Sequence, residues 1–100
     1  MKIFRIVGSS MEPNFYHGEY VVVRKKRSDK LRIGHVVLIN TQHLGCLVKR
    51  VEKINKHFII VGGDSLRSVL NDHIGKVLYN QIVGTVVLRL SLRGRLHIIS

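Results

Sequence analysis

Short runs of apolar, mostly β-branched residues alternate along this chain with glycine, asparagine, aspartate and histidine. Runs of this length are typical of strands and are too short to form long amphipathic helices. The pattern predicts strands at residues 2–7, 19–25, 35–40, 45–54, 57–61, 82–90 and 95–99. Only brief helical turns are expected, near Glu12–Tyr16, where Pro13 suits the opening position, and near Ser65–Leu70.

The glycines punctuate this pattern. Most of them lie at or near the ends of predicted strands, where a sheet turns tight corners. The expected fold is therefore mainly β, a compact coiled sheet or barrel. One hundred residues predict a single domain over residues 1–100 with one core. The apolar fraction of 45% and the charged fraction of 23% are those of a globular chain.

The charge balance narrows the range of partners. Seventeen Lys and Arg against six Asp and Glu give a net charge of +11, which favours contact with nucleic acid or with an anionic membrane surface. The plainer alternative is a basic protein that is simply soluble. The sequence contains neither an apolar stretch of transmembrane length nor a secretory signal. We therefore expect a cytoplasmic protein, or one held peripherally on a membrane face.

Cysteine and histidine offer little chemistry of their own. The single cysteine, Cys46, excludes an internal disulfide, and its apolar neighbours predict a small buried side chain. The six histidines are scattered and do not pair at metal-ligand spacing. No metal site and no cofactor are expected.

Two polar residues stand out against their surroundings. Ser10 lies in a turn of small residues directly after an apolar run, and Lys49 lies inside another apolar run. If that run is a strand, Leu47, Lys49 and Val51 share one face, and Arg50 projects into solvent on the other face, near Glu52. A serine nucleophile needs a base, and burial among apolar side chains favours the neutral amine that can act as one. The ordinary alternatives are a turn serine and a lysine that reaches solvent at a sheet edge.

The motifs around these residues resemble a known family. Ser10-Met11-Glu12-Pro13 resembles the Ser-Met-x-Pro signature of type I signal peptidases, and Lys49-Arg50-Val51 resembles their lysine box. Segments similar to Gly18–Val23, Gly34–Val37 and Gly63-Asp64 occur in the family in the same order. The LexA/UmuD self-cleaving clan shares this order, but Pro13 and Gly63-Asp64 favour the signal-peptidase branch. The resemblance covers about residues 5–85 and extends to small soluble members, such as the maturation proteases of nickel-type superoxide dismutase.

The resemblance implies a serine endopeptidase that cleaves a peptide bond in a protein precursor. Ser10 would be the nucleophile and Lys49 the general base. The oxyanion would be held by the Ser10 amide with Gly8 and Ser9. The remaining implied roles are support of Lys49 by Ser68, with Ser65 as a substitute, and substrate binding by Met11 and Pro13. The sequence departs from the family after Ser68, where Leu70, Asn71 and Asp72 replace Asp, Ser and Arg.

Two non-catalytic alternatives remain open. A basic β-domain could bind nucleic acid through Arg89, Arg93 and Arg95, although the chain carries no stripe of aromatic residues for base stacking. A degenerate peptidase fold could bind peptides without cutting them, which the altered segment after Asp64 would favour. Proteolysis is the reading that accounts for Ser10 and Lys49 together.

Overall fold

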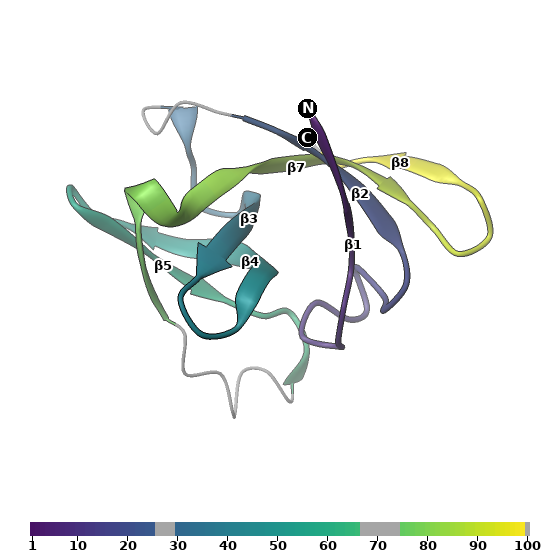
Figure 1. The fold of residues 1–100 in the computed structure, drawn as a ribbon, viewed down its shortest axis with the longest axis horizontal. Helices are drawn as coiled ribbons and strands as arrows, with labels where there is room; N and C mark the ends of the chain where they lie inside the picture. Colours follow the sequence, from purple (N-terminus) through teal and green to yellow (C-terminus); the bar gives the residue numbers. More distant parts are fainter. Residues whose placement is uncertain (26–29, 67–74, 100) are drawn as a thin grey trace.

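A computed structural model describes residues 1–25, 30–66 and 75–99. In these residues eight strands form one antiparallel sheet in the order β1-β2-β7-β3-β4-β5-β6, with β8 also pairing β7 (Figure 1). The strands are β1 (Lys2–Arg5), β2 (Tyr20–Arg24), β3 (Val36–Thr41), β4 (Gly45–Ile54), β5 (Phe58–Gly62), β6 (Lys76–Leu78), β7 (Ile82–Leu90) and β8 (Leu96–Ile98). A short 3₁₀ helix, η2 (Tyr79–Gln81), leads into β7.

The prediction of a mainly β, compact fold is confirmed. The radius of gyration is 12.5 Å, close to the roughly 13 Å of a compact chain of this length. The seven predicted strands each correspond to an observed strand. The sequence pattern missed β6, which is three residues long and buries only Val77. The helical turn expected near Ser65–Leu70 falls largely outside the described residues.

Strand β7 is the centre of the sheet. Its first part, Ile82–Thr85, pairs with β3, and the part from Thr85 to Leu90 pairs with β2. Strand β8 pairs with the last three residues of β7, on the side opposite β2. The register shifts within the β2–β7, β3–β7 and β4–β5 ladders. Such bulges bend strands, so they help the sheet to curl around its core.

The curled sheet encloses hydrophobic side chains on both faces of β3. Val36 and Leu38 belong to one buried cluster, and Val37 and Ile39 belong to a second. Because successive side chains of a strand point to opposite faces, burial of all four means that both faces of β3 are covered. The first cluster contains Ile6, Met11, Phe15, Val21, Val23, Val36, Leu38, Val48 and Val86. The second contains Leu31, Val37, Ile39, Val51, Ile59, Val61 and Val77.

A buried ion pair ties the loop between β1 and β2 to β7. Arg89 donates from its Nε and a terminal nitrogen to the two carboxylate oxygens of Glu19, at 2.9 and 2.8 Å. The Tyr16 amide donates to the same carboxylate at 2.7 Å. Burial alone would raise the pKa of Glu19, but these hydrogen bonds and the charge of Arg89 outweigh it and hold the pKa below its usual range.

Within residues 1–25, 30–66 and 75–99, no helix is long and apolar enough to cross a membrane.

Candidate active site

Ser10 lies in a turn at residues 9–15, called the serine turn below. Buried side chains that follow Ser10 anchor this turn in the core. Met11 and Phe15 are both buried in the first cluster, and the amides of Asn14 and Phe15 donate to the Met11 carbonyl at 2.9 Å. The expected turn near Glu12–Tyr16 is thereby confirmed. Ser10, one residue before the Met11 anchor, is partly exposed. The buried Met11 beside it fixes the position of the Ser10 backbone.

Lys49 is buried at the middle of β4, with 5% of its surface exposed. Its backbone pairs with Val37 of β3. Leu47 and Val51, which share its face, pack in the second cluster, as the alternation of the sequence predicted.

A small cavity joins the serine turn to the strand that carries Lys49. Its volume is about 20 Å³, which is room for roughly one water molecule or one methyl group. Its walls come from β1 and the residues after it, from the serine turn, and from the part of β4 just before Lys49. The lining residues are Phe4, Ile6, Val7, Gly8, Ser10, Met11, Cys46, Leu47 and Val48. The fold therefore brings the turn of Ser10 against β4 directly before Lys49.

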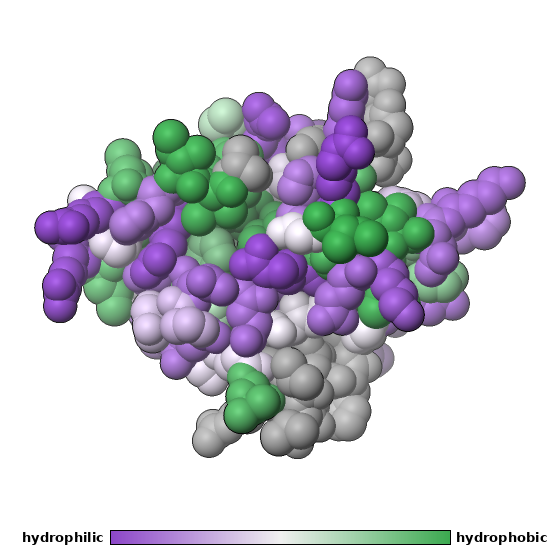
Figure 2. Space-filling model, turned by 180° about the vertical axis from the view of Figure 1, so that it is seen from behind, coloured by the Kyte–Doolittle hydropathy of each residue, from purple (hydrophilic) through white to green (hydrophobic). Residues whose placement is uncertain are grey.

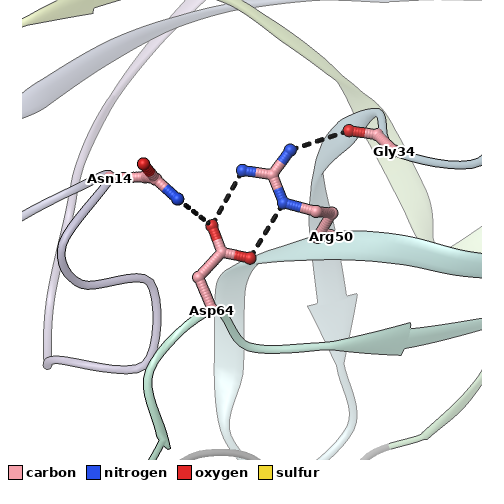
Figure 3. Close-up of polar contacts among 4 residues, drawn as sticks. All are labelled: Asn14, Gly34, Arg50 and Asp64. Atoms are coloured by element: carbon pink, nitrogen blue, oxygen red, sulfur yellow. Dashed lines mark hydrogen bonds and ion pairs between the residues drawn. The ribbon is translucent and has the colours of Figure 1, made fainter.

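A clamp of three side chains, Asn14, Arg50 and Asp64, holds the serine turn and β4 in place (Figure 3). Arg50 donates from Nε and a terminal nitrogen to the two carboxylate oxygens of Asp64, each at 2.8 Å. Its other terminal nitrogen donates to the Gly34 carbonyl at 2.8 Å. The Asn14 side-chain amide donates to Asp64 at 2.9 Å. Arg50 follows Lys49 and Asn14 lies four residues after Ser10, so the clamp connects both candidate catalytic segments.

The clamp corrects one prediction. Arg50 was expected to be solvated near Glu52, but it is only partly exposed and pairs with Asp64. Burial alone would raise the pKa of the Asp64 carboxyl. The hydrogen bonds from Arg50 and Asn14, with the charge of Arg50, outweigh burial and hold that pKa below its usual range. Asp64 is therefore a structural anion and accepts hydrogen bonds from both sides of the site.

Two further hydrogen bonds fix the backbone on either side of Ser10. The Ser65 amide donates to the Ser10 carbonyl at 2.9 Å. The Gly8 amide donates to Nδ1 of His17 at 3.0 Å. The Gly8 amide is thus already engaged, which leaves the Ser10 amide and the Ser9 hydroxyl as the predicted oxyanion donors. The predicted supporting residue Ser68 lies outside the described residues.

The predicted substrate-binding residues have different environments. Met11 is 2% exposed and belongs to the core, yet it also forms part of the cavity wall. Pro13 is exposed, follows a cis peptide bond and is not part of the described cavity lining. The prediction of a buried Cys46 is wrong: Cys46 is exposed and lines the cavity, because β4 begins at the molecular surface.

Asn14 and His17 are the site residues that sequence reasoning missed. Both act on the serine turn through hydrogen bonds to residues that are distant in the sequence or across the turn. No local pattern indicates such contacts. Asp64 belongs to the Gly63-Asp64 motif. Its negative charge was a signal in the sequence from which a pairing with an arginine could have been predicted.

Within the described residues, His, Cys, Asp and Glu nowhere gather into a group of three that could hold a metal ion. The geometry offers instead a nucleophile candidate, a buried amine and a positioned backbone.

Comparison with known proteins identifies a family for this chain. The chain has no significant match among the curated proteins or the solved structures. The model of a protein family described as Peptidase S24-like matches residues 1–87, a range that holds the serine turn, β4 and Asp64. Because the match covers most of the chain, the chain belongs to the Peptidase S24-like family.

Proposed function

We propose that this protein is a serine endopeptidase in which Ser10 is the nucleophile and Lys49 the general base. The observation that carries the proposal is the shared cavity: Ser10 and the residues of β4 directly before the buried Lys49 line the same small space. Membership of the Peptidase S24-like family supports a peptidase function in general terms. The clamp from Arg50 to Asp64 and Asn14 supports it further, because it would keep the two groups in a fixed relation.

The proposed reaction proceeds through an acyl-enzyme. The Ser10 hydroxyl transfers its proton to the neutral Lys49 amine as Oγ attacks the carbonyl carbon of the scissile peptide bond. The resulting ammonium group gives the proton to the leaving amine, and the C–N bond breaks. Lys49, neutral again, then takes a proton from a water molecule that attacks the ester. Release of the acid returns the proton to Ser10.

The tetrahedral intermediates carry a negative oxygen that needs hydrogen-bond donors. The Ser10 amide and the Ser9 hydroxyl are the donors we assign to it. A preorganised donor of this kind is typically worth about 3–4 kcal/mol of transition-state stabilisation. The contact of His17 with Gly8 and that of Ser65 with Ser10 would hold these donors in position.

Substrates would bind in extended form between two strand edges. Residues 45–49 of β4 pair with β3 on one side, while the β5 ladder begins only at Arg50. Strand β1 pairs with β2, and in the described residues no strand pairs with its other edge. An extended peptide could add to either edge by backbone hydrogen bonds. The cavity of about 20 Å³ fits a methyl group, so we expect small side chains such as alanine next to the scissile bond.

The test is cleavage of a proteome-derived peptide mixture, read by mass spectrometry. Ser10→Ala and Lys49→Met are each expected to lower the cleavage rate by at least about a thousandfold, because removal of either member disables the same step. Ser9→Ala removes a proposed oxyanion donor and is expected to lower the rate by about a hundredfold or more. The matched control is Lys53→Met, an exposed lysine on the same strand as Lys49. Unfolding curves of all four variants separate loss of chemistry from loss of fold.

The pH dependence of kcat/KM for peptide cleavage is a second test of the same proposal. Only the neutral amine accepts the proton of Ser10, so kcat/KM is expected to rise with pH. Cleavage that survives both Ser10→Ala and Lys49→Met would contradict the dyad. The absence of any cleavage by the folded wild-type protein would favour the alternative of a non-catalytic basic β-domain that binds peptides or nucleic acid.

A further inference from the structure

The strand register builds a hydrophobic face on the outside of β1, β2, β7 and β8. Ile3 lies opposite Val22, Val22 opposite Leu88, and Leu88 opposite Ile98. A second row of directly opposed residues runs two positions along each strand. That row consists of Arg5, Tyr20, Leu90 and Leu96. We call the apolar members of the two rows the outer face: Ile3, Tyr20, Val22, Leu88, Leu90, Leu96 and Ile98.

The outer face points away from the core. The alternate residues of β1 and β2 face inward: Val21 and Val23 are buried in the first cluster, and Phe4 packs against it. In contrast, Ile3 is 74% exposed, Leu96 68% and Ile98 84%. Figure 2 shows hydrophobic atoms beside strongly hydrophilic ones at the β7–β8 end of the molecule. Contiguous apolar surface of this kind marks an interaction site on a protein that is otherwise soluble.

The charges around the outer face are all of one sign. The four strands and the hairpin between β7 and β8 contain no Asp or Glu. They carry six cationic residues: Lys2, Arg5, Arg24, Arg89, Arg93 and Arg95. Arg89 is neutralised by Glu19, which comes from the loop before β2. The other five leave the surroundings of an apolar sheet face strongly positive.

This combination fits one kind of partner. An anionic bilayer surface accepts aliphatic side chains at its interface and attracts arginine and lysine beside them. Nucleic acid would use the arginines but gains little from exposed Ile and Leu. A second copy of the chain would bring equal positive charges together, which opposes association. Charge and apolar content together therefore select the membrane.

We propose that the outer face docks the protein peripherally on an anionic membrane surface. Residues 88–98, which supply four of the seven outer-face side chains, lie beyond the residues that match the family. The face is therefore a feature of this chain that the family match does not account for. Phe4, on the opposite side of β1 from Ile3, lines the Ser10 cavity, so docking would hold that cavity near the bilayer. The docking itself does not depend on peptidase activity.

The test is co-sedimentation of the purified protein with vesicles of phosphatidylcholine alone or mixed with phosphatidylglycerol. Binding is expected only with the mixed vesicles and is expected to weaken as salt is raised. Leu96→Thr/Ile98→Thr should lower the partition coefficient about tenfold or more. Arg93→Gln/Arg95→Gln should lower it about fivefold for each arginine removed. Both variants should unfold like the wild type. For Leu96→Thr/Ile98→Thr the reason is that threonine keeps strand preference at these exposed positions.

Matched controls lie elsewhere on the surface. Ile33→Thr removes an exposed isoleucine from a turn outside the outer face, and Lys53→Gln/Lys56→Gln removes two exposed lysines near the β4–β5 turn. Both should bind vesicles nearly as the wild type does. The proposal is overturned by an equal loss in the controls or by a wild type that ignores phosphatidylglycerol. It is also overturned if the threonine pair changes only self-association in sedimentation equilibrium. Loss in the arginine variant alone, matched by loss of oligonucleotide binding, would assign the surface to nucleic acid.

Discussion

At the scale of single residues, Asp64 connects the two segments that carry the candidate catalytic residues. Its carboxylate accepts hydrogen bonds from Arg50, the neighbour of Lys49, and from Asn14 in the serine turn. The segment that carries Asp64 also supplies the Ser65 amide that binds the Ser10 carbonyl. One carboxylate therefore sets the distance between the turn and β4, although it is not proposed to touch the substrate.

Replacement of Asp64 by asparagine tests this role. Asp64→Asn keeps the shape of the side chain but removes the charge that strengthens the bonds to Arg50. Because Arg50 is about a third exposed, solvent moderates the loss, and we expect the free energy of unfolding to fall by about 1–2 kcal/mol. The measurement is urea unfolding alongside the peptide cleavage rate. The control Glu52→Gln, an exposed carboxylate on the same strand as Arg50, should change neither quantity; an equal effect there would rule out a special role for Asp64.

The residue scale also shows what a sequence can reveal. Ser10 and Lys49 could be singled out because each is a polar residue in an apolar or tightly turned segment. The contact between Asn14 and Asp64 could not, since it exists only after the β1–β2 loop closes on the segment after β5. The apolar neighbours of Cys46 predict a buried side chain. The start of β4 runs at the surface, however, and there the neighbours in sequence do not decide burial.

At the scale of elements, the paired strands β2 and β7 approach each other closely at Gly84. A Cβ on Gly84 would lie 2.5 Å from the Arg24 carbonyl oxygen and 2.9 Å from a methyl group of Val23. The first of these atoms is backbone in a paired strand, so it has little freedom to move. Glycine is required here because β3 and β2 both pair with β7 within a few residues.

Gly84→Ala is therefore expected to destabilise the fold. Overpacking of this kind costs about 1–3 kcal/mol, which denaturant unfolding would show as a lower midpoint. Gly62→Ala is the matched control, because the atoms its Cβ would meet are the carboxylate of Glu52, the end of an exposed flexible side chain. Equal destabilisation by both substitutions would mean that the close approach at Gly84 is not what matters.

The elements themselves were largely predictable, while their order was not. Apolar runs bounded by turn residues identified seven strands, because burial of alternate or successive side chains leaves a local record. The pairing of β2 and β3 with β7 leaves none, since it depends on contacts between distant segments. The three residues of β6 were missed because a single buried residue carries no period.

At the scale of the whole molecule, two buried or half-buried carboxylates hold together parts that are distant in sequence. Glu19 joins the first loop to β7, and Asp64 joins the serine turn to β4. In both, hydrogen bonds with arginine outweigh burial and leave the pKa below its usual range. A carboxyl whose pKa is lower in the folded than in the unfolded state stabilises the fold when it is ionised.

The sign of the pH dependence follows. The stabilisation is complete above the unfolded pKa values of roughly 4 and is lost as pH falls through the lower folded values. We expect urea midpoints that are nearly constant from neutral pH down to about pH 5 and fall steeply below it. Asp64→Asn should lose part of this slope, so that its difference from wild type is largest near neutrality and shrinks in acid. A difference that is independent of pH would contradict the ionised Asp64 anchor.

The central place of β7 also has a consequence for folding during synthesis on the ribosome. Strand β2 ends at Arg24, but the part of β7 that pairs with it begins only at Thr85. The ion pair of Glu19 likewise cannot form until Arg89 has been synthesised. The hairpins β3–β4 and β4–β5 can form soon after they emerge, whereas the first loop gains its ion pair with β7 only when almost the whole chain has been made. A growing chain therefore carries its serine long before the fold around it is complete, and any cutting activity would be withheld until synthesis has passed β7.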